Sequence, residues 1–118
     1  MILWGMSRIL INDEKGTILV KSLIVAESFR DRTRGLLGRD GLGTDSGMLL
    51  RHCRSIHMWF MRFPIDAAFL DKEMRVLKVS RNLQPWQLGL APRQTRCVLE
   101  TAAGVLEHIN IGDQLTET

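Results

Sequence analysis

The chain has 118 residues, 45% of them hydrophobic and 25% charged, which suits one compact domain over residues 1–118 and excludes two independent cores or extensive disorder. The N-terminal residues lack the charge and apolar run of a signal peptide, and no apolar stretch reaches the roughly 18 residues that span a membrane, so we expect a soluble cytoplasmic protein. The net charge of +3 is unevenly distributed along the chain. Residues 30–96 hold 13 Lys and Arg against 6 Asp and Glu, whereas residues 97–118 hold 4 Asp and Glu and no Lys or Arg. The two regions should therefore attract each other.

The first predicted element is a β-hairpin near the N-terminus. β-prone runs at residues 8–11 and 17–20 flank a polar segment, and Gly16 occupies the turn position that needs a positive φ. A strand continues through residues 23–25. Ser28 and Asp31 then resemble a capping box, which predicts a short helix that ends at Gly38.

The rest of the chain is predicted to be mainly strands. Four are expected at residues 48–50, 55–61, 67–70 and 75–79, with a tight turn over residues 71–74, in an antiparallel meander. Residues 82–92 form a long loop that contains Trp86, and long loops in compact domains are often functional. A strand at 96–100, a short helix at 102–110 and an edge strand at 111–115 follow. These elements predict an α+β fold, with a curved or barrel-like, mostly antiparallel β-sheet and two short helices.

Side chains that could bind a ligand or take part in catalysis are concentrated between residues 47 and 71. On one unbroken strand, Cys53 and His57 would lie about 13 Å apart, too far for two ligands of one zinc ion. We therefore expect no metal and no cofactor, and we expect Cys53 to be a buried structural thiol. The chain also has no Gly-rich phosphate loop, serine elbow or dinucleotide fingerprint.

Asp66 and Glu100 are the acidic residues best placed to be buried. Asp66 follows Pro64 at the start of a predicted strand, and Glu100 ends an apolar one. If both carboxylates converge with His57, acid–base catalysis becomes available. If Asp66 instead uses both oxygens on local amides and on Arg62, its role is structural.

Several short motifs occur together along the chain. In chain order they are Arg34-Gly35-Leu36-Leu37-Gly38-Arg39, Gly47-Met48-Leu49-Leu50, Ile56-His57, Met61-Arg62-Phe63-Pro64-Ile65-Asp66, Pro85-Trp86, Val98-Leu99-Glu100, Ala103-Gly104 and Ile111-Gly112-Asp113. In order and spacing they resemble the domain of unknown function 192 family, over about residues 20–118. The resemblance implies a small bacterial or archaeal α+β domain with a barrel-like sheet and no established activity. Met58 and Trp59 depart from the Thr-aromatic pair common in such relatives.

The preferred interpretation is a non-catalytic binding module for a small anionic ligand or a peptide. The residues expected to line its site are His57, Trp59, Arg62, Asp66, Trp86 and Glu100. One alternative is a hydrolase-type enzyme that uses Asp66, His57 and Glu100 for proton transfer. Another is a nucleic-acid contact protein, with arginines between residues 30 and 39 as a basic patch and Trp86 stacked on a base. A homodimer through an exposed edge strand is the default expectation for assembly.

Overall fold

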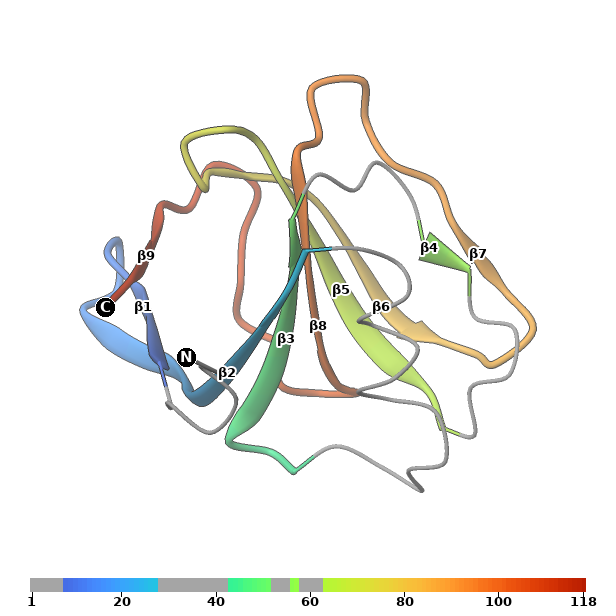
Figure 1. The fold of residues 1–118 in the computed structure, drawn as a ribbon, viewed down its shortest axis with the longest axis horizontal. Helices are drawn as coiled ribbons and strands as arrows, with labels where there is room; N and C mark the ends of the chain where they lie inside the picture. Colours follow the sequence, from blue (N-terminus) through green and yellow to red (C-terminus); the bar gives the residue numbers. More distant parts are fainter. Residues whose placement is uncertain (1–7, 28–42, 52–55, 58–62) are drawn as a thin grey trace.

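The structure is a computed structural model that describes residues 8–27, 43–51, 56–57 and 63–118. Nine strands and no helix occur in these ranges (Figure 1). The strands are β1 (Arg8–Asn12), β2 (Thr17–Ala26), β3 (Ser46–Arg51), β4 (Ile56–His57), β5 (Ile65–Leu70), β6 (Val76–Leu83), β7 (Leu88–Gly89), β8 (Cys97–Ala102) and β9 (Leu115–Glu117). The predicted α+β class is therefore wrong, because the described chain is all-β.

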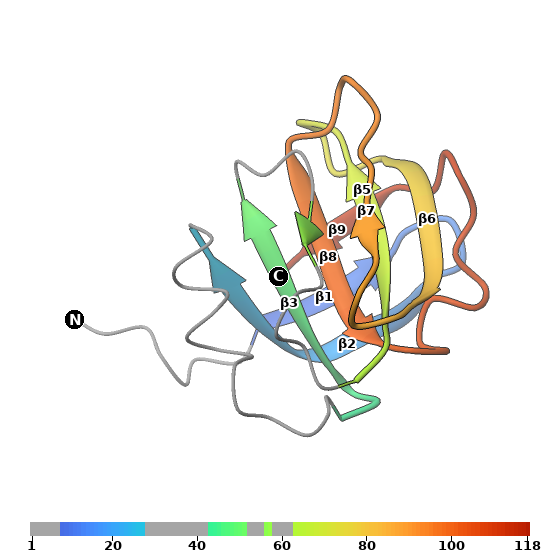
Figure 2. The same ribbon diagram turned by 90° about the vertical axis from the view of Figure 1, so that its right-hand side faces the viewer.

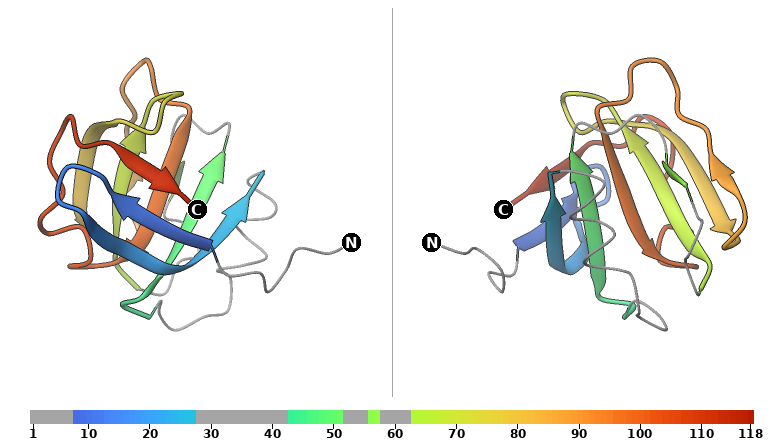
Figure 3. Two further views of the ribbon diagram at one scale, coloured as in Figure 1. Left: turned by 90° about the vertical axis from the view of Figure 1, so that its left-hand side faces the viewer. Right: turned by 45° about the vertical axis from the view of Figure 1, so that its right-hand side comes forward.

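Seven of the strands form one open mixed sheet in the order β6-β5-β8-β3-β2-β1-β9. Its neighbours pair antiparallel except for β2 and β3, which are parallel. The antiparallel meander predicted for residues 48–79 holds only for β5 and β6, because β8 lies between β3 and β5 and β4 belongs to another sheet. β4 and β7 form a separate two-stranded ribbon. This ribbon lies on the side of the molecule away from β1 and β9 (Figure 3).

The large sheet is strongly curved, and its two end strands approach each other (Figure 2). Arg75, just before β6, forms an isolated antiparallel bridge with Gln114, just before β9. The backbone N–H of Leu115 donates to the Met74 carbonyl at 3.0 Å, and that of Val76 donates to the Asp113 carbonyl at 2.9 Å. These contacts tie the chain ahead of β9 to the start of β6.

Both faces of the sheet are covered by apolar side chains, so all six residues of β5 are buried. Because side chains alternate along a strand, β3, β5 and β8 each contribute to two separate clusters. The first, here called the Phe69 face, includes Met48, Leu50, Ala67, Phe69 and Val98. The second, here called the Leu99 face, includes Leu49, Ala68, Leu70, Leu99 and Leu115.

The two turns predicted from local chemistry are confirmed. Gly16 has a φ of 61° between β1 and β2, the left-handed conformation expected of it. Between β5 and β6, the Met74 N–H donates to the Asp71 carbonyl at 3.0 Å. The Asp71 carboxylate also accepts hydrogen bonds from the backbone of Glu73 and Arg75. Such side-chain bonds stabilise a turn locally, which is why the sequence alone identifies it.

The helix predicted over residues 102–110 is replaced by a run of tight turns. Val105, Glu107 and Ile109 each donate a backbone hydrogen bond to the carbonyl three residues earlier, and not four as in an α-helix. Gly104 has a φ of 97°, which an α-helix cannot contain. The other predicted helix, which begins at Ser28, lies outside the described residues.

Candidate functional site

Asp66 is buried in β5, where it is 1% exposed, and its carboxylate holds two separate backbone segments. Oδ1 accepts a hydrogen bond from the Asn82 N–H at 2.9 Å. Oδ2 accepts from the Gly104 N–H at 2.9 Å and from the Leu106 N–H at 3.1 Å. Both oxygens thus accept hydrogen bonds from backbone amides of distant segments, so the position of Asp66 is that of a structural residue.

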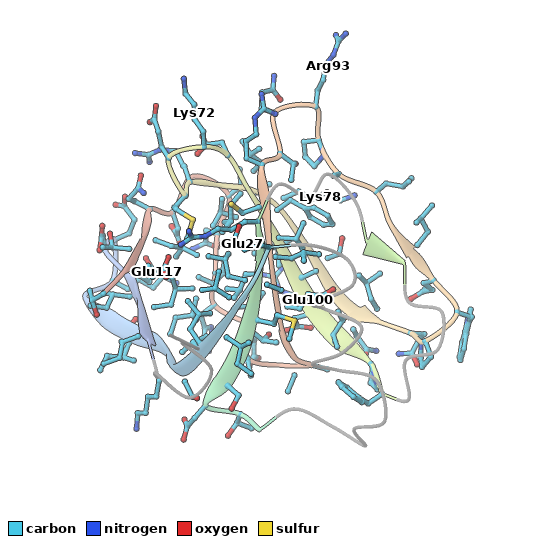
Figure 4. The ribbon with its side chains drawn as sticks, in the orientation of Figure 1. Glu27, Lys72, Lys78, Arg93, Glu100 and Glu117 are labelled. Atoms are coloured by element: carbon cyan, nitrogen blue, oxygen red, sulfur yellow. The ribbon has the colours of Figure 1, made fainter. Side chains whose placement is uncertain are left out.

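Glu100 lies on the opposite face of the sheet from Asp66. In the pairing of β5 with β8, Asp66 is opposite Thr101 and Ala67 is opposite Glu100. Ala67 belongs to the Phe69 face, so Glu100 points to that face, whereas Asp66 points to the Leu99 face with Ala68. Glu100 is fully buried in the interior of the molecule (Figure 4). The two carboxylates are therefore separated by the sheet and cannot share one substrate proton.

The remaining predicted site residues do not complete a catalytic group within the described chain. His57 lies in β4 and pairs through its backbone with Leu88 of β7. Trp59 and Arg62 lie outside the described residues, as does Cys53. In the ranges that the structure describes, no three His, Cys, Asp or Glu side chains are grouped as metal ligands would be. The shared site and the expected lack of a metal both stay predictions.

Trp86 is exposed, so its side chain does not pack into the core to hold its loop in place. Its exposed fraction is 74%, and those of Leu88 and Leu90 are 47% and 63%. Trp86 lies in a tight turn that is closed by the Gln87 N–H, which donates to the Gln84 carbonyl at 2.9 Å, and Gln87 is exposed as well. Leu88 and Leu90 flank the buried Gly89 at β7, where residues two apart point the same way. Three large apolar side chains are thus exposed along one short segment. We call residues Trp86, Leu88 and Leu90 the apolar strip.

Leu88 and Leu90 were not among the predicted site residues. The alternation of the two leucines with Gly89 is visible in the sequence and is the signal that identifies them. What the pattern leaves open is which side faces solvent. The burial of Gly89 supplies that answer.

The end of the apolar strip is fixed to the large sheet by Lys78. The Lys78 ammonium donates to the Leu90 carbonyl at 2.7 Å and lies 5.6 Å from the centre of the Phe69 ring. This places the segment after β7 over the Phe69 face. Arg93 follows at the tip of the next loop and projects outward (Figure 4), and Arg96 is also exposed.

The geometry defines a small all-β domain that carries an exposed apolar strip. The chain belongs to the DUF192 family, described as uncharacterized ACR, whose model matches residues 10–116. This confirms the resemblance found in the motifs. No helix in the described part of the chain is long and apolar enough to cross a membrane.

Two archaeal relatives and one solved structure illustrate the similarity. The UPF0127 protein of Thermococcus sibiricus is 32% identical over 112 residues, covering 90% of this chain and 72% of the relative. That of Pyrococcus horikoshii is 31% identical over 111 residues, covering 90% and 96%. A protein of unknown function from Novosphingobium aromaticivorans has a TM-score of 0.77 at 21% identity, over 92% of this chain and 82% of that chain. This last likeness shows a shared fold alone.

Proposed function

We propose that this protein is a non-catalytic, cytoplasmic binding module that takes an extended peptide segment of another protein on the apolar strip. The observation that carries the proposal is the exposure of Trp86, Leu88 and Leu90 within one short segment of the chain. Scattered single apolar residues on a surface need no explanation, but a contiguous row of them is typical of a binding surface. Tryptophan is also among the residues that contribute most to binding energy in protein interfaces.

A peptide fits this strip better than a small anionic ligand does. Small ligands bind in hollows that bury most of their surface, whereas the strip is outward and exposed. Leu88 and Leu90 lie two residues apart at β7, so their spacing is about 6.6 Å, that of alternate side chains in an extended peptide. An extended partner that covers both leucines can continue to Trp86 in the adjoining turn.

Two alternatives are less well supported. A hydrolase that uses Asp66 with Glu100 lacks support because the carboxylates lie on opposite faces of the sheet and Asp66 already accepts three backbone hydrogen bonds. Single-stranded nucleic acids bind through successive aromatic side chains, and in the strip Trp86 is followed by two leucines. Leucine offers no aromatic face for a base, so the strip favours a polypeptide.

Selection from a display library of random linear peptides tests the proposal. We expect the wild-type chain to enrich peptides with apolar residues at alternate positions, and the W86S and L88S variants to lose that enrichment. Ile18 and Ile111 are exposed by 53% and 73% but lie outside the strip, so I18S and I111S are matched controls that should keep it. Enrichment of no peptide, or equal enrichment by W86S, would overturn the proposal.

A further inference from the structure

The apolar strip has a basic border at one end. Lys78 contacts the backbone of Leu90, and Arg93 and Arg96 follow within six residues of it. Within the described chain, no carboxylate lies within ion-pair distance of Lys78, Arg93 or Arg96. Among the described residues, the border therefore carries positive charge that no carboxylate neutralises.

The sequence around the strip contributes no negative charge. Residues 74–99 contain five Lys and Arg and no Asp or Glu. The acid that directly follows β5, Asp71, has its carboxylate turned to the backbone of Glu73 and Arg75 in its own turn. Of the three basic residues, Arg93 and Arg96 are exposed, so a partner can reach them without displacing packed side chains.

From this juxtaposition we infer that the partner segment is acidic, with alternating apolar residues that cover the strip and Asp or Glu residues at the end that lies beside Arg93 and Arg96. This inference rests on the proposed function and adds the charge of the partner to it. Charge complementarity at the border of an interface raises the association rate and selects among partners, while apolar contact supplies most of the affinity. Guanidinium groups suit carboxylates because they present paired donors.

The test uses two dye-labelled synthetic peptides of equal length in fluorescence anisotropy titrations. Both have alternating leucine, threonine and valine, and one ends in three aspartates whereas the other ends in three lysines. We expect the acidic peptide to bind at least about tenfold more tightly at low salt, and the difference to shrink as NaCl is added. Both peptides should lose binding to the W86S variant.

A pair of double variants with the same change in net charge isolates the border. R93Q/R96Q removes the two exposed arginines that follow the strip in the chain, and K21Q/K72Q removes two exposed lysines elsewhere in the chain. We expect R93Q/R96Q to weaken the acidic peptide about fivefold, and K21Q/K72Q to leave its affinity almost unchanged. Thermal unfolding of both variants checks that the fold is retained.

The outcomes separate this inference from the proposed function. Equal binding of the two peptides, with both abolished by W86S, would overturn the acidic partner and leave the peptide-binding strip in place. Equal weakening by the two double variants would reduce the effect to net charge and would also overturn it. If neither peptide binds and the display library yields no peptide, both proposals fail. Tighter binding of a labelled oligothymidylate than of either peptide would overturn both proposals and indicate that the partner is a nucleic acid.

Discussion

Asp66 offers the sharpest test at the level of a single residue. D66A removes the acceptor for the backbone N–H groups of Asn82, Gly104 and Leu106 and leaves them without a partner. A buried donor that loses its partner costs about 1–3 kcal/mol, so we expect the free energy of unfolding to fall by about 3 kcal/mol or more. Urea denaturation measures this loss.

Asp71 is the matched control for that experiment. Its carboxylate also accepts backbone hydrogen bonds, from Glu73 at 2.8 Å and Arg75 at 3.0 Å, but in an exposed turn where water can replace it. We expect D71A to cost about 1 kcal/mol at most. Equal losses in D66A and D71A would contradict a special structural role for Asp66.

Thr95 and Thr101 form a second comparison, because both are fully buried and differ in their hydrogen bonds. The Thr95 hydroxyl has no partner within the described chain, whereas the Thr101 hydroxyl donates to the Ala102 carbonyl at 3.1 Å. Valine has the same shape without the hydroxyl. We therefore expect T95V to keep or raise stability by up to about 1 kcal/mol, and T101V to lower it by about 1 kcal/mol. Thermal unfolding measures the stability of both variants. A larger loss of stability in T95V than in T101V would show that the Thr95 hydroxyl has a hydrogen-bond partner in solution.

Among the elements, the turns at residues 103–108 depend on a long side chain from β6. The Arg81 guanidinium donates to the Ile109 carbonyl at 2.7 Å and to the Leu106 carbonyl at 3.3 Å. Because these turns lack helical hydrogen bonds, such external donors satisfy their carbonyls. We expect R81M to speed amide hydrogen exchange in residues 103–109 and to leave β3 and β8 protected. K72M, which changes an exposed turn residue, is the control. Faster exchange throughout the sheet in R81M would contradict a role of Arg81 limited to these turns.

The elements also divide into those that local chemistry predicts and those that it does not. The turns at Gly16 and at residues 71–74 follow from neighbouring residues, and both were predicted. The local pattern at residues 102–110 wrongly predicts a helix, because what prevents the helix is not local. The amides of Gly104 and Leu106 donate to Asp66, some 40 positions away in the sequence. The parallel pairing of β2 with β3 is equally non-local.

For the candidate site, the same division decides what the sequence can supply. The alternation of the apolar strip is local and visible between residues 86 and 90. Whether Asp66 and Glu100 face each other depends on the register between β5 and β8, and a shift by one residue would move either carboxylate to the other face. No pattern within either strand fixes that register.

At the scale of the whole molecule, the attraction predicted between the basic and acidic regions has a direct counterpart among the described residues. The guanidinium of Arg51 on β3 lies 2.7 Å from the carboxylate of Glu117 on β9. These strands are separated by β2 and β1 in the sheet, so the curvature of the sheet brings the pair together. The Arg51 side chain is 35% exposed and that of Glu117 is 15% exposed, which limits the strength of the pair through solvent screening.

A double-mutant cycle with R51M and E117Q measures how much this pair contributes to holding the two strands together. The Glu27 carboxylate also lies 3.8 Å from the Arg51 guanidinium and interacts with it. The cycle therefore isolates the Glu117 contribution better than either single variant does. We expect a coupling of about 0.5–1 kcal/mol in urea denaturation at low salt, falling as NaCl is raised. A coupling near zero at low salt would mean that backbone pairing of β9 with β1 and the bridge from Gln114 to Arg75 set the curvature without help from charge.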